Sequence, residues 1–271
     1  MSEAALFATM TFPEIYERML AGPLFRPFAE DLIARLNPGT HDRLLDVACG
    51  TGIVARVARE RMGPATPIVG VDASLPMLAV ARRIDSTIDW REGNATALPI
   101  DEDERFSLLT CHQGLQFFQD KAAAVREMRR VLLPEGRVAI GTWRPLAELA
   151  MLRELHPIAE QQLGPVVDAR HSFGDGDAIA GLLTGAGFHT VQVETISHNI
   201  RMPDGTIFAR LNATALASMS AKGKAMTEGD RQQTIERIVS DSAATIAKYT
   251  TGGALVFELS TNLVTAATPQ D

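Results

Sequence analysis

The chain alternates short apolar runs with longer amphipathic segments from Arg43 onward. Each apolar run has the length of a buried strand, and each amphipathic segment repeats its apolar positions at helical spacing. This alternation is typical of βαβ units, in which a crossover helix joins neighbouring parallel strands. The pattern predicts strands at 44–47, 68–71, 106–111 and 137–142, and helices at 53–62, 76–83 and 121–132.

The flanking segments extend this plan. Residues 13–36 carry apolar positions at helical spacing and stop at Pro38-Gly39, so one or two leading helices are expected. With the later strands the sheet reaches roughly seven strands, which is ordinary for an open α/β sheet. The other predicted elements are a turn at 133–136, a helix at 177–186, strands at 191–196 and 254–264, and two helical stretches at 146–163 and 208–249 that we expect to cap one edge of the sheet.

Composition narrows the choice of function. The 271 residues are 46% hydrophobic and 22% charged, enough to bury a large core. A net charge of −7 provides no basic field, so nucleic acid is not expected as a partner. Cys49 and Cys111 are far apart in predicted core segments, which favours neither a disulfide framework nor a metal site. No stretch resembles a secretion signal or a membrane span, so we expect a cytoplasmic protein.

The segment LLDVACGTGIVARVARE carries the most informative chemistry. An apolar strand ends in Asp46, and a turn containing Gly50 and Gly52 leads into a helix; glycine permits the tight turn and lets a ligand approach the backbone. The same glycines fit a dinucleotide pattern, with Asp72 about 20 residues further on. The Asp46 carboxylate would repel a pyrophosphate but suits the ammonium group of S-adenosylmethionine (SAM). The charge therefore favours SAM over NAD.

This segment resembles motif I of class I SAM-dependent methyltransferases, in the type 11 group similar to the ubiquinone and menaquinone biosynthesis enzymes. IVGVDASLPMLAVAR resembles the second motif, in which an acid, here Asp72, binds both ribose hydroxyls and a hydrophobic residue, here Met77, packs on adenine. WREGNATALPI resembles the third, with Asn94 where Asp is usual. FSLLTCHQGLQFF and EMRRVLLPEGRVAIGTW resemble the segments that follow. The resemblance covers residues 44–143, and a weaker one covers 181–193.

The resemblance implies SAM as cofactor and a set of contact residues. Asn94 would offer its carbonyl oxygen to the adenine amino group, and Cys111 would contact SAM through its backbone. His112 is the candidate catalytic residue, since its imidazole could accept a proton from an acceptor hydroxyl, but a positioning or structural role is favoured. Glutamines 113 and 116 would bind SAM or substrate, or else cap a turn. The expected cofactor contacts are Tyr16, Asp46, Ala48, Gly50, Gly52, Asp72, Ala73, Met77, Asn94, Ala95, Cys111, Gln113 and Gln116.

The expected fold is a Rossmann-like, seven-stranded, mostly parallel sheet with helices on both faces and a helical cap. The expected function is methyl transfer from SAM to a small, hydrophobic metabolite held in an apolar cap pocket, with the acceptor atom left open. A nicotinamide-dependent oxidoreductase and a noncatalytic SAM-binding module are the alternatives, and a homodimer is one option for the assembly. The predicted parts are lid helices at 1–40, the SAM-binding core at 41–145, a cap insertion at 146–175, a core helix and strand at 176–202, cap helices at 203–251 and a closing strand at 252–271.

Overall fold

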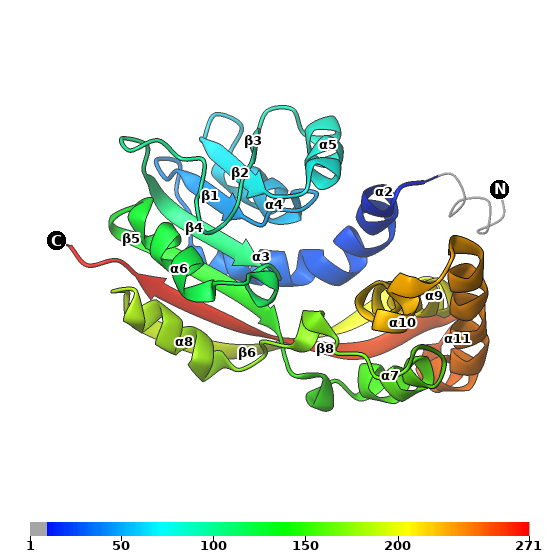
Figure 1. The fold of residues 1–271 in the computed structure, drawn as a ribbon. Coiled ribbons are helices and arrows are strands. Elements are labelled where there is room, and N and C mark those ends of the chain that lie inside the picture. The colour runs from blue at the N-terminus through cyan, green and yellow to red at the C-terminus, as the bar shows by residue number, and fades with distance from the viewer. Residues whose placement is uncertain (1–9, 271) are drawn as a thin grey trace. The chain divides into compact units, whose positions relative to one another are not determined.

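A computed structural model describes residues 10–270 of the chain (Figure 1). Eight strands join in a single sheet, in the order β3-β2-β1-β4-β5-β8-β6 with β7 paired to β8. The strands are β1 (Leu44–Val47), β2 (Ile68–Asp72), β3 (Asp89–Glu92), β4 (Phe106–His112), β5 (Leu132–Trp143), β6 (His189–Met202), β7 (Thr250–Thr251) and β8 (Ala254–Ala267).

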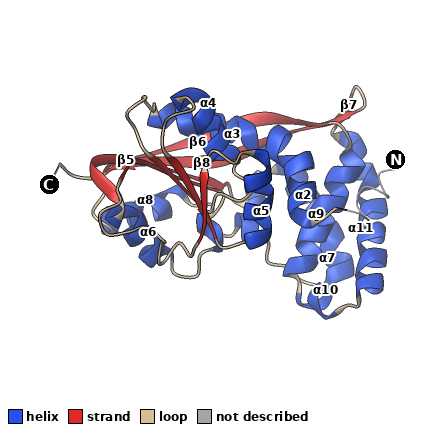
Figure 2. Ribbon diagram, turned by 90° about the horizontal axis from the view of Figure 1, so that it is seen from above, coloured by secondary structure: helices blue, strands red, loops and turns tan. Residues whose placement is uncertain are grey.

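The helices are drawn in blue in Figure 2. They are α2 (Phe12–Tyr16), η1 (Glu17–Phe25), α3 (Arg26–Leu36), α4 (Ile53–Met62), α5 (Leu75–Ile84), η2 (Leu115–Phe117), α6 (Lys121–Arg130), η3 (Leu146–Glu148), α7 (Ala150–Leu163), η4 (Ala169–His171), α8 (Gly176–Gly185), α9 (Gly205–Met219), α10 (Ala221–Ala225) and α11 (Glu228–Lys248).

The chain divides into two compact units. Unit 1 comprises Met1–Thr142, Asp175–Ile196 and Thr261–Asp271, and unit 2 comprises Trp143–Gly174 and Ser197–Ser260.

Unit 1 holds the parallel part of the sheet. β1 pairs in parallel with β2 and β4, β2 with β3, and β4 with β5, which confirms the predicted α/β fold. Every residue of β1 is buried, as is nearly all of β4, because helices cover both faces of these strands. α3 packs against α4 and α6 against α8. Carboxyl ends of parallel strands meet at one edge of the sheet, so any side chain at those ends faces the same region.

Strand boundaries differ from the prediction where polar residues enter the sheet. β3 and β7 are additional to the predicted strands, since each is short and carries no apolar run. The turn predicted at 133–136 is wrong, because these residues lie within β5. The ladder between β4 and β5 shifts register there, Glu135 takes a positive φ of 59°, and its amide donates to the Pro269 carbonyl oxygen. The Pro-Glu-Gly sequence thus forms a bulge within β5, in place of the predicted turn.

The leading helices form a continuous run that we call the lid, residues 12–36. Its middle part, η1, is a π-helix of nine residues with Pro23 inside. Proline has no amide hydrogen, so the regular α-helical bond cannot form at that position and a wider turn replaces it. α3 then ends at Asn37 in the left-handed conformation. The run agrees with the predicted leading helices.

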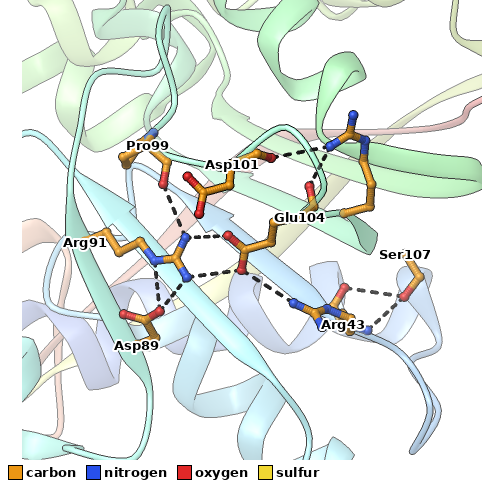
Figure 3. Close-up of polar contacts among 8 residues, drawn as sticks. Arg43, Asp89, Arg91, Pro99, Asp101, Glu104 and Ser107 are labelled. Atoms are coloured by element: carbon orange, nitrogen blue, oxygen red, sulfur yellow. Dashed lines mark hydrogen bonds and ion pairs between the residues drawn. The ribbon is translucent and has the colours of Figure 1, made fainter.

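A charged network fastens β3 to the segment that precedes β4 (Figure 3). Both Glu104 carboxylate oxygens accept hydrogen bonds from Arg91, at 2.6 and 3.1 Å, and Arg91 also pairs with Asp89 at 2.7 Å. These contacts, led by Glu104, raise the pKa of Arg91. Arg43 joins at 3.5 Å and lies over the Phe106 ring. A forked pair of this kind fixes orientation better than a single surface ion pair does.

Unit 2 has a helical core of its own. Its buried side chains include Ala159, Leu163, Leu216 and Ile238, contributed by α7, α9 and α11, with Met219 partly buried against them. Side chains cap the long helices: Asp204 accepts from the first amides of α9, and Thr227 accepts from an amide of α11. The periodicity of residues 146–163 and 208–249 therefore reflects packing inside this unit.

Between residues 10 and 270, no helix combines the length and apolar character needed to cross a membrane. In the same range, no three His, Cys, Asp or Glu side chains gather in a way that could hold a metal ion.

Candidate functional site

Asp46 is a carboxylate inside a fully buried strand. It is 1% exposed, and its Oδ1 accepts a hydrogen bond from the Thr110 hydroxyl at 2.8 Å. Its Oδ2 is buried and has no hydrogen-bond partner among the described residues. Burial raises the pKa of Asp46 to about 7, opposed chiefly by the Thr110 hydroxyl. A buried acceptor without a donor costs roughly 1–3 kcal/mol, so the position suits a ligand that brings a donor or a positive charge.

The loop after Asp46 is strained and partly open. Ala48 adopts a positive φ of 57°, a rare conformation for a residue with a side chain. Gly50 has a φ of 56°, and a Cβ placed there would meet no described atom within 4 Å. A Cβ on Gly52 would instead lie 2.2 Å from the Trp90 ring. Gly50 thus leaves space beside the loop, whereas Gly52 makes room for a tryptophan, which the sequence pattern did not indicate.

Asp72, at the end of β2, supports this loop. Its Oδ2 accepts from the Gly50 amide at 2.8 Å and its Oδ1 from the Ser74 amide at 2.7 Å. Each carboxylate oxygen can accept more than one hydrogen bond, so both retain capacity for the hydroxyl groups of a ribose. Ser74 also caps α5, on whose first turn the half-buried Met77 lies. The predicted second motif therefore adjoins the first.

Asn94, after β3, is already engaged. Its Oδ1 accepts hydrogen bonds from the Thr96 amide at 3.0 Å and from the Thr96 hydroxyl at 2.9 Å. The oxygen that we expected to meet the adenine amino group therefore closes a local turn. The Asn94 side chain still has an amide nitrogen to offer, so its contact with adenine stays a prediction. Its neighbour Ala95 is buried.

A buried chain of hydrogen bonds orders the residues that follow β4. The Thr261 hydroxyl donates to the Thr142 carbonyl oxygen at 2.7 Å, so it accepts from Gln113 Nε2 at 3.1 Å. Gln113 Oε1 then accepts from Gln116 Nε2 at 3.2 Å. This sequence of donors and acceptors fixes the orientation of both side-chain amides and leaves Gln116 Oε1 outside the hydrogen-bonded series. That oxygen is buried, and no described residue donates to it.

The sequence could not have indicated that Thr142 and Thr261 take part in these hydrogen bonds, because Thr261 lies 148 positions from Gln113. Gln113 itself has a φ of 56°, and its amide donates to the Gly141 carbonyl oxygen at 2.8 Å. Strained residues persist where their surroundings hold them and often mark functional sites.

His112 is 8% exposed at the carboxyl end of β4. Burial lowers the pKa of His112 to about 4, so the imidazole is neutral at physiological pH. The Phe25 ring meets it edge to face at 6.1 Å, and a Cβ on Gly141 would lie 2.8 Å from its Cδ2. Such an imidazole can orient a ligand by hydrogen bonding but is a weak base. The geometry suits the positioning alternative better than proton abstraction.

Both cysteines are free and buried. Burial raises the pKa of Cys111 to about 12 and also raises the pKa of Cys49. Neither thiol ionises at neutral pH, so neither is a nucleophile.

Tyr16 belongs to the lid and is half-buried. Its ring contacts the Phe25 ring, tilted by 36° and with centroids 5.0 Å apart. Burial raises the pKa of Tyr16, and the negative charges of Glu17, Asp72 and Asp46 raise it further. The hydroxyl therefore stays protonated and lies within the field of both site acids.

The predicted residues thus come from one edge of the sheet. They lie at or just beyond the carboxyl ends of β1, β2, β3 and β4, and the lid adds Tyr16; this is the edge at which open α/β sheets bind ligands. By strand end they are Asp46, Ala48, Gly50 and Gly52; Asp72, Ala73 and Met77; Asn94 and Ala95; and Cys111, His112, Gln113 and Gln116.

The apolar residues predicted to line a cap pocket are mostly buried. Leu152, Leu155, Leu211 and Leu216 are among them, and Leu216 belongs to the core of unit 2. Unit 2 also contains a pocket of about 230 Å³ lined by Leu149, Met151, Phe257, Tyr249, Glu148 and others. That volume is below the roughly 300 Å³ at which small-molecule sites begin. We assign it no ligand.

Known proteins resemble the chain in both sequence and structure. The family described as "Methyltransferase domain" matches residues 45–140. Nocamycin O-methyltransferase of Saccharothrix syringae is 30% identical over 197 residues, 66% of this chain and 69% of that protein. Ubiquinone/menaquinone biosynthesis C-methyltransferase UbiE of Xanthomonas axonopodis pv. citri is 41% identical over 113 residues, 40% of this chain and 44% of UbiE. The chain thus matches less than half the length of this relative.

Solved structures share the fold. The YcgJ protein of Bacillus subtilis aligns with a TM-score of 0.57 at 19% identity, over 90% of this chain and 100% of that one. Phosphoethanolamine N-methyltransferase 2 of Haemonchus contortus, solved with SAM, aligns with a TM-score of 0.58 at 18% identity, over 99% of this chain and 58% of that one. Taken with the nocamycin relative and the matched domain, the Asp46 loop and Asp72 identify the chain as a member of the class I SAM-dependent methyltransferases, with SAM as its cofactor.

Proposed function

We propose that this protein transfers the methyl group of SAM to a small, mostly hydrophobic acceptor. The observation that carries the proposal is the buried Asp46 oxygen that no described residue satisfies, beside a loop that leaves space at Gly50. An ammonium group fits that position, because it brings both a charge and donors. Two relatives with small-molecule names, the nocamycin and ubiquinone/menaquinone enzymes, support a small acceptor, as does the net charge of −7.

The chain's own residues would bind and orient the cofactor. Asp46 would accept from the ammonium group, and Asp72 would accept from the ribose hydroxyls while it holds the Gly50 amide. Met77 would pack on adenine, and Tyr16 would cover the site from the lid. SAM supplies an electrophilic methyl group when bound. The protein's contribution is then to align the acceptor with that group and to exclude water.

We assign the residues after β4 to the acceptor side of the site. His112, kept neutral by burial, would orient the acceptor through a hydrogen bond. Gln116 would offer its fixed Oε1 to an N–H or O–H group of the acceptor or of SAM. A hydroxyl acceptor with a pKa of about 10 would need its proton removed by solvent or by another group, since an imidazole with so low a pKa does so poorly. An amine that binds neutral needs no such base.

Incubation of purified protein with SAM and matched acceptors tests this function. The probes are menadiol, which carries two aromatic hydroxyls on a naphthalene ring, a hydrophobic amine such as tryptamine, total RNA and bulk protein. We expect mass spectrometry to find a methylated small molecule and no methylated macromolecule. Methylated RNA or protein, with no product among extractable small molecules of a whole-cell extract, would contradict the acceptor class. Failure of the protein to transfer methyl groups to any of these, despite SAM binding, would favour the noncatalytic alternative.

A further inference from the structure

Arg56 contacts two parts of the cofactor site with one guanidinium group. Its Nη1 donates to the Thr51 carbonyl oxygen at 2.6 Å, and its Nη2 donates to Glu17 Oε1 at 2.7 Å. Thr51 belongs to the loop after β1, which we call the cofactor loop (residues 48–52), whereas Glu17 is the first residue of η1 in the lid. The planar fork of an arginine holds two acceptors in fixed directions. The guanidinium group therefore ties the lid to the cofactor loop.

The location of Arg56 is unfavourable without these partners. α4 begins at Ile53, so Arg56 lies at the end of its first turn, where the helix dipole favours anions over cations. The first turn contains no acidic residue to balance the charge. The two side chains of the pair are only 16% and 22% exposed, so water screens their attraction less than it would at the surface. A residue that breaks a local rule in this way often serves function.

Glu17 retains acceptor capacity within the same region. Its Oε2 is buried and lacks a hydrogen-bond partner among residues 10–270. Its neighbour Tyr16 lies within the field of Asp46 and Asp72, so this part of the lid borders the acids of the site. The lid also pairs with α5 through Glu14 and Arg83, and with α4 through Arg26 and Glu60. Neither of those involves the cofactor loop.

We propose that Glu17 and Arg56 are positioning residues for the cofactor: their pair holds the lid against the cofactor loop and slows the release of S-adenosyl compounds. The inference rests on the proposed cofactor site. Because Arg56 bonds the Thr51 carbonyl oxygen and Glu17 together, lid position and loop geometry change together. Movement of the lid away from the loop removes the Glu17 carboxylate and leaves a cation near the positive end of α4.

A double-mutant cycle with S-adenosylhomocysteine as the probe tests the pair. The variants are Glu17→Gln, Arg56→Met and the combination, with affinity measured by calorimetry and release measured with labelled probe. We expect each single change to raise the dissociation constant and the release rate about tenfold, and the combination to be no worse than either. Unchanged affinity in Arg56→Met, or effects that multiply in the combination, would overturn the proposal.

A second readout separates positioning from plain stability. In the wild type, the probe should slow amide hydrogen exchange across residues 12–25, and this protection should be lost in both single variants. If the variants melt earlier yet keep that protection, the pair is only structural and the proposal fails. Arg56→Lys keeps the charge without the fork, so it should fall between Arg56→Met and the wild type; full recovery would show that the two contacts need not be held together.

Arg26→Met is the matched control. This change also removes an arginine that joins the lid to α4, through Glu60. Unlike Arg56, however, Arg26 makes no hydrogen bond to the described residues of the cofactor loop. Its affinity for the probe should equal that of the wild type, and a tenfold loss there would overturn the specific role of Arg56. If the wild type itself failed to bind S-adenosylhomocysteine, the proposed site would be wrong, which is a different outcome from loss in the variants alone.

Discussion

At the scale of single residues, Asp46 links stability to function. Its pKa is raised by burial to about 7, against about 3.9 in an unfolded chain. A raised pKa in the folded state stabilises the fold below pH 4, and this contribution is lost as pH rises through about 7. Ionisation of Asp46 near neutral pH therefore lowers the stability of the cofactor-free protein and places a negative charge beside the cofactor loop.

Asp46→Asn should remove this pH dependence. The amide cannot ionise, so the cofactor-free variant should lose less unfolding free energy than the wild type between pH 5 and pH 8. The difference between the two proteins should be on the order of 1 kcal/mol or more. Urea unfolding at both pH values measures it. Parallel pH profiles for the two proteins would show that Asp46 is ionised or solvated in the folded state.

Asp72→Ala should weaken binding of SAM and S-adenosylhomocysteine by tenfold or more. The change frees the Gly50 amide and would remove the two charge-assisted hydrogen bonds that we propose to the ribose, each worth roughly 1.5–3 kcal/mol. Calorimetry measures the loss, with circular dichroism to check folding. Ser74→Ala is the control, since it removes only the cap of α5. Equal affinity in a folded Asp72→Ala variant would remove this acid from the site.

The residues proposed to bind the cofactor were more predictable than the residues that support them. Asp46 and Asp72 stand at strand ends in a recognisable order, so their placement at the sheet edge follows from the βαβ pattern. Trp90 under Gly52 and Thr261 behind Gln113 lie on other strands, at separations fixed only by the folded sheet. The local hydrogen bonds of Asn94 could not be predicted either, because its oxygen accepts from Thr96 only two residues further on.

At the scale of elements, the β1–α4 connection depends on two glycines for different reasons. Both have positive φ, but only Gly52 faces a side chain, the Trp90 ring. β3 carries that ring, and the charged network at Arg91 holds β3 in place. The conformation of the cofactor loop is therefore fixed by the packing of Trp90 against Gly52 and by the hydrogen bond from the Gly50 amide to Asp72.

Gly52→Ala should destabilise the protein more than Gly50→Ala. Both changes place a side chain at positive φ, which costs roughly 1–2 kcal/mol, and only the first also forces a Cβ into Trp90. We expect a difference of about 1–3 kcal/mol in unfolding free energy, measured in urea. Equal stability of the two variants would mean that Trp90 moves aside freely.

Element boundaries were harder to predict than element types. The bulge in β5 uses residues that favour turns, and the hydrogen bonds of Glu135 and Gly136 to the C-terminal segment hold them in the strand. β6 runs from His189 to Met202, well beyond the apolar run that predicted it, because its side chains alternate between half-buried and exposed. A strand whose fully buried side chains are just Ile200 and Met202 gives little signal.

At the scale of the whole molecule, the chain combines a parallel α/β unit with a helical unit. The first could be predicted because each βαβ step repeats a local pattern, and the resemblance to methyltransferase motifs named its cofactor. The second could be predicted only as helical. Its apolar side chains pack in its own core, so their composition alone does not define an acceptor pocket. The predicted domain boundaries remain a prediction.

The central claim is that Asp46 receives the ammonium group of the cofactor, and proton release tests it most directly. At pH 6 the free Asp46 is mostly protonated, whereas the cofactor's positive charge would hold it ionised. Calorimetry of S-adenosylhomocysteine binding in buffers of different ionisation enthalpy should show release of nearly one proton, about 0.9, by the wild type and almost none by Asp46→Asn. The same release in both proteins, or none in the wild type, would contradict the claim.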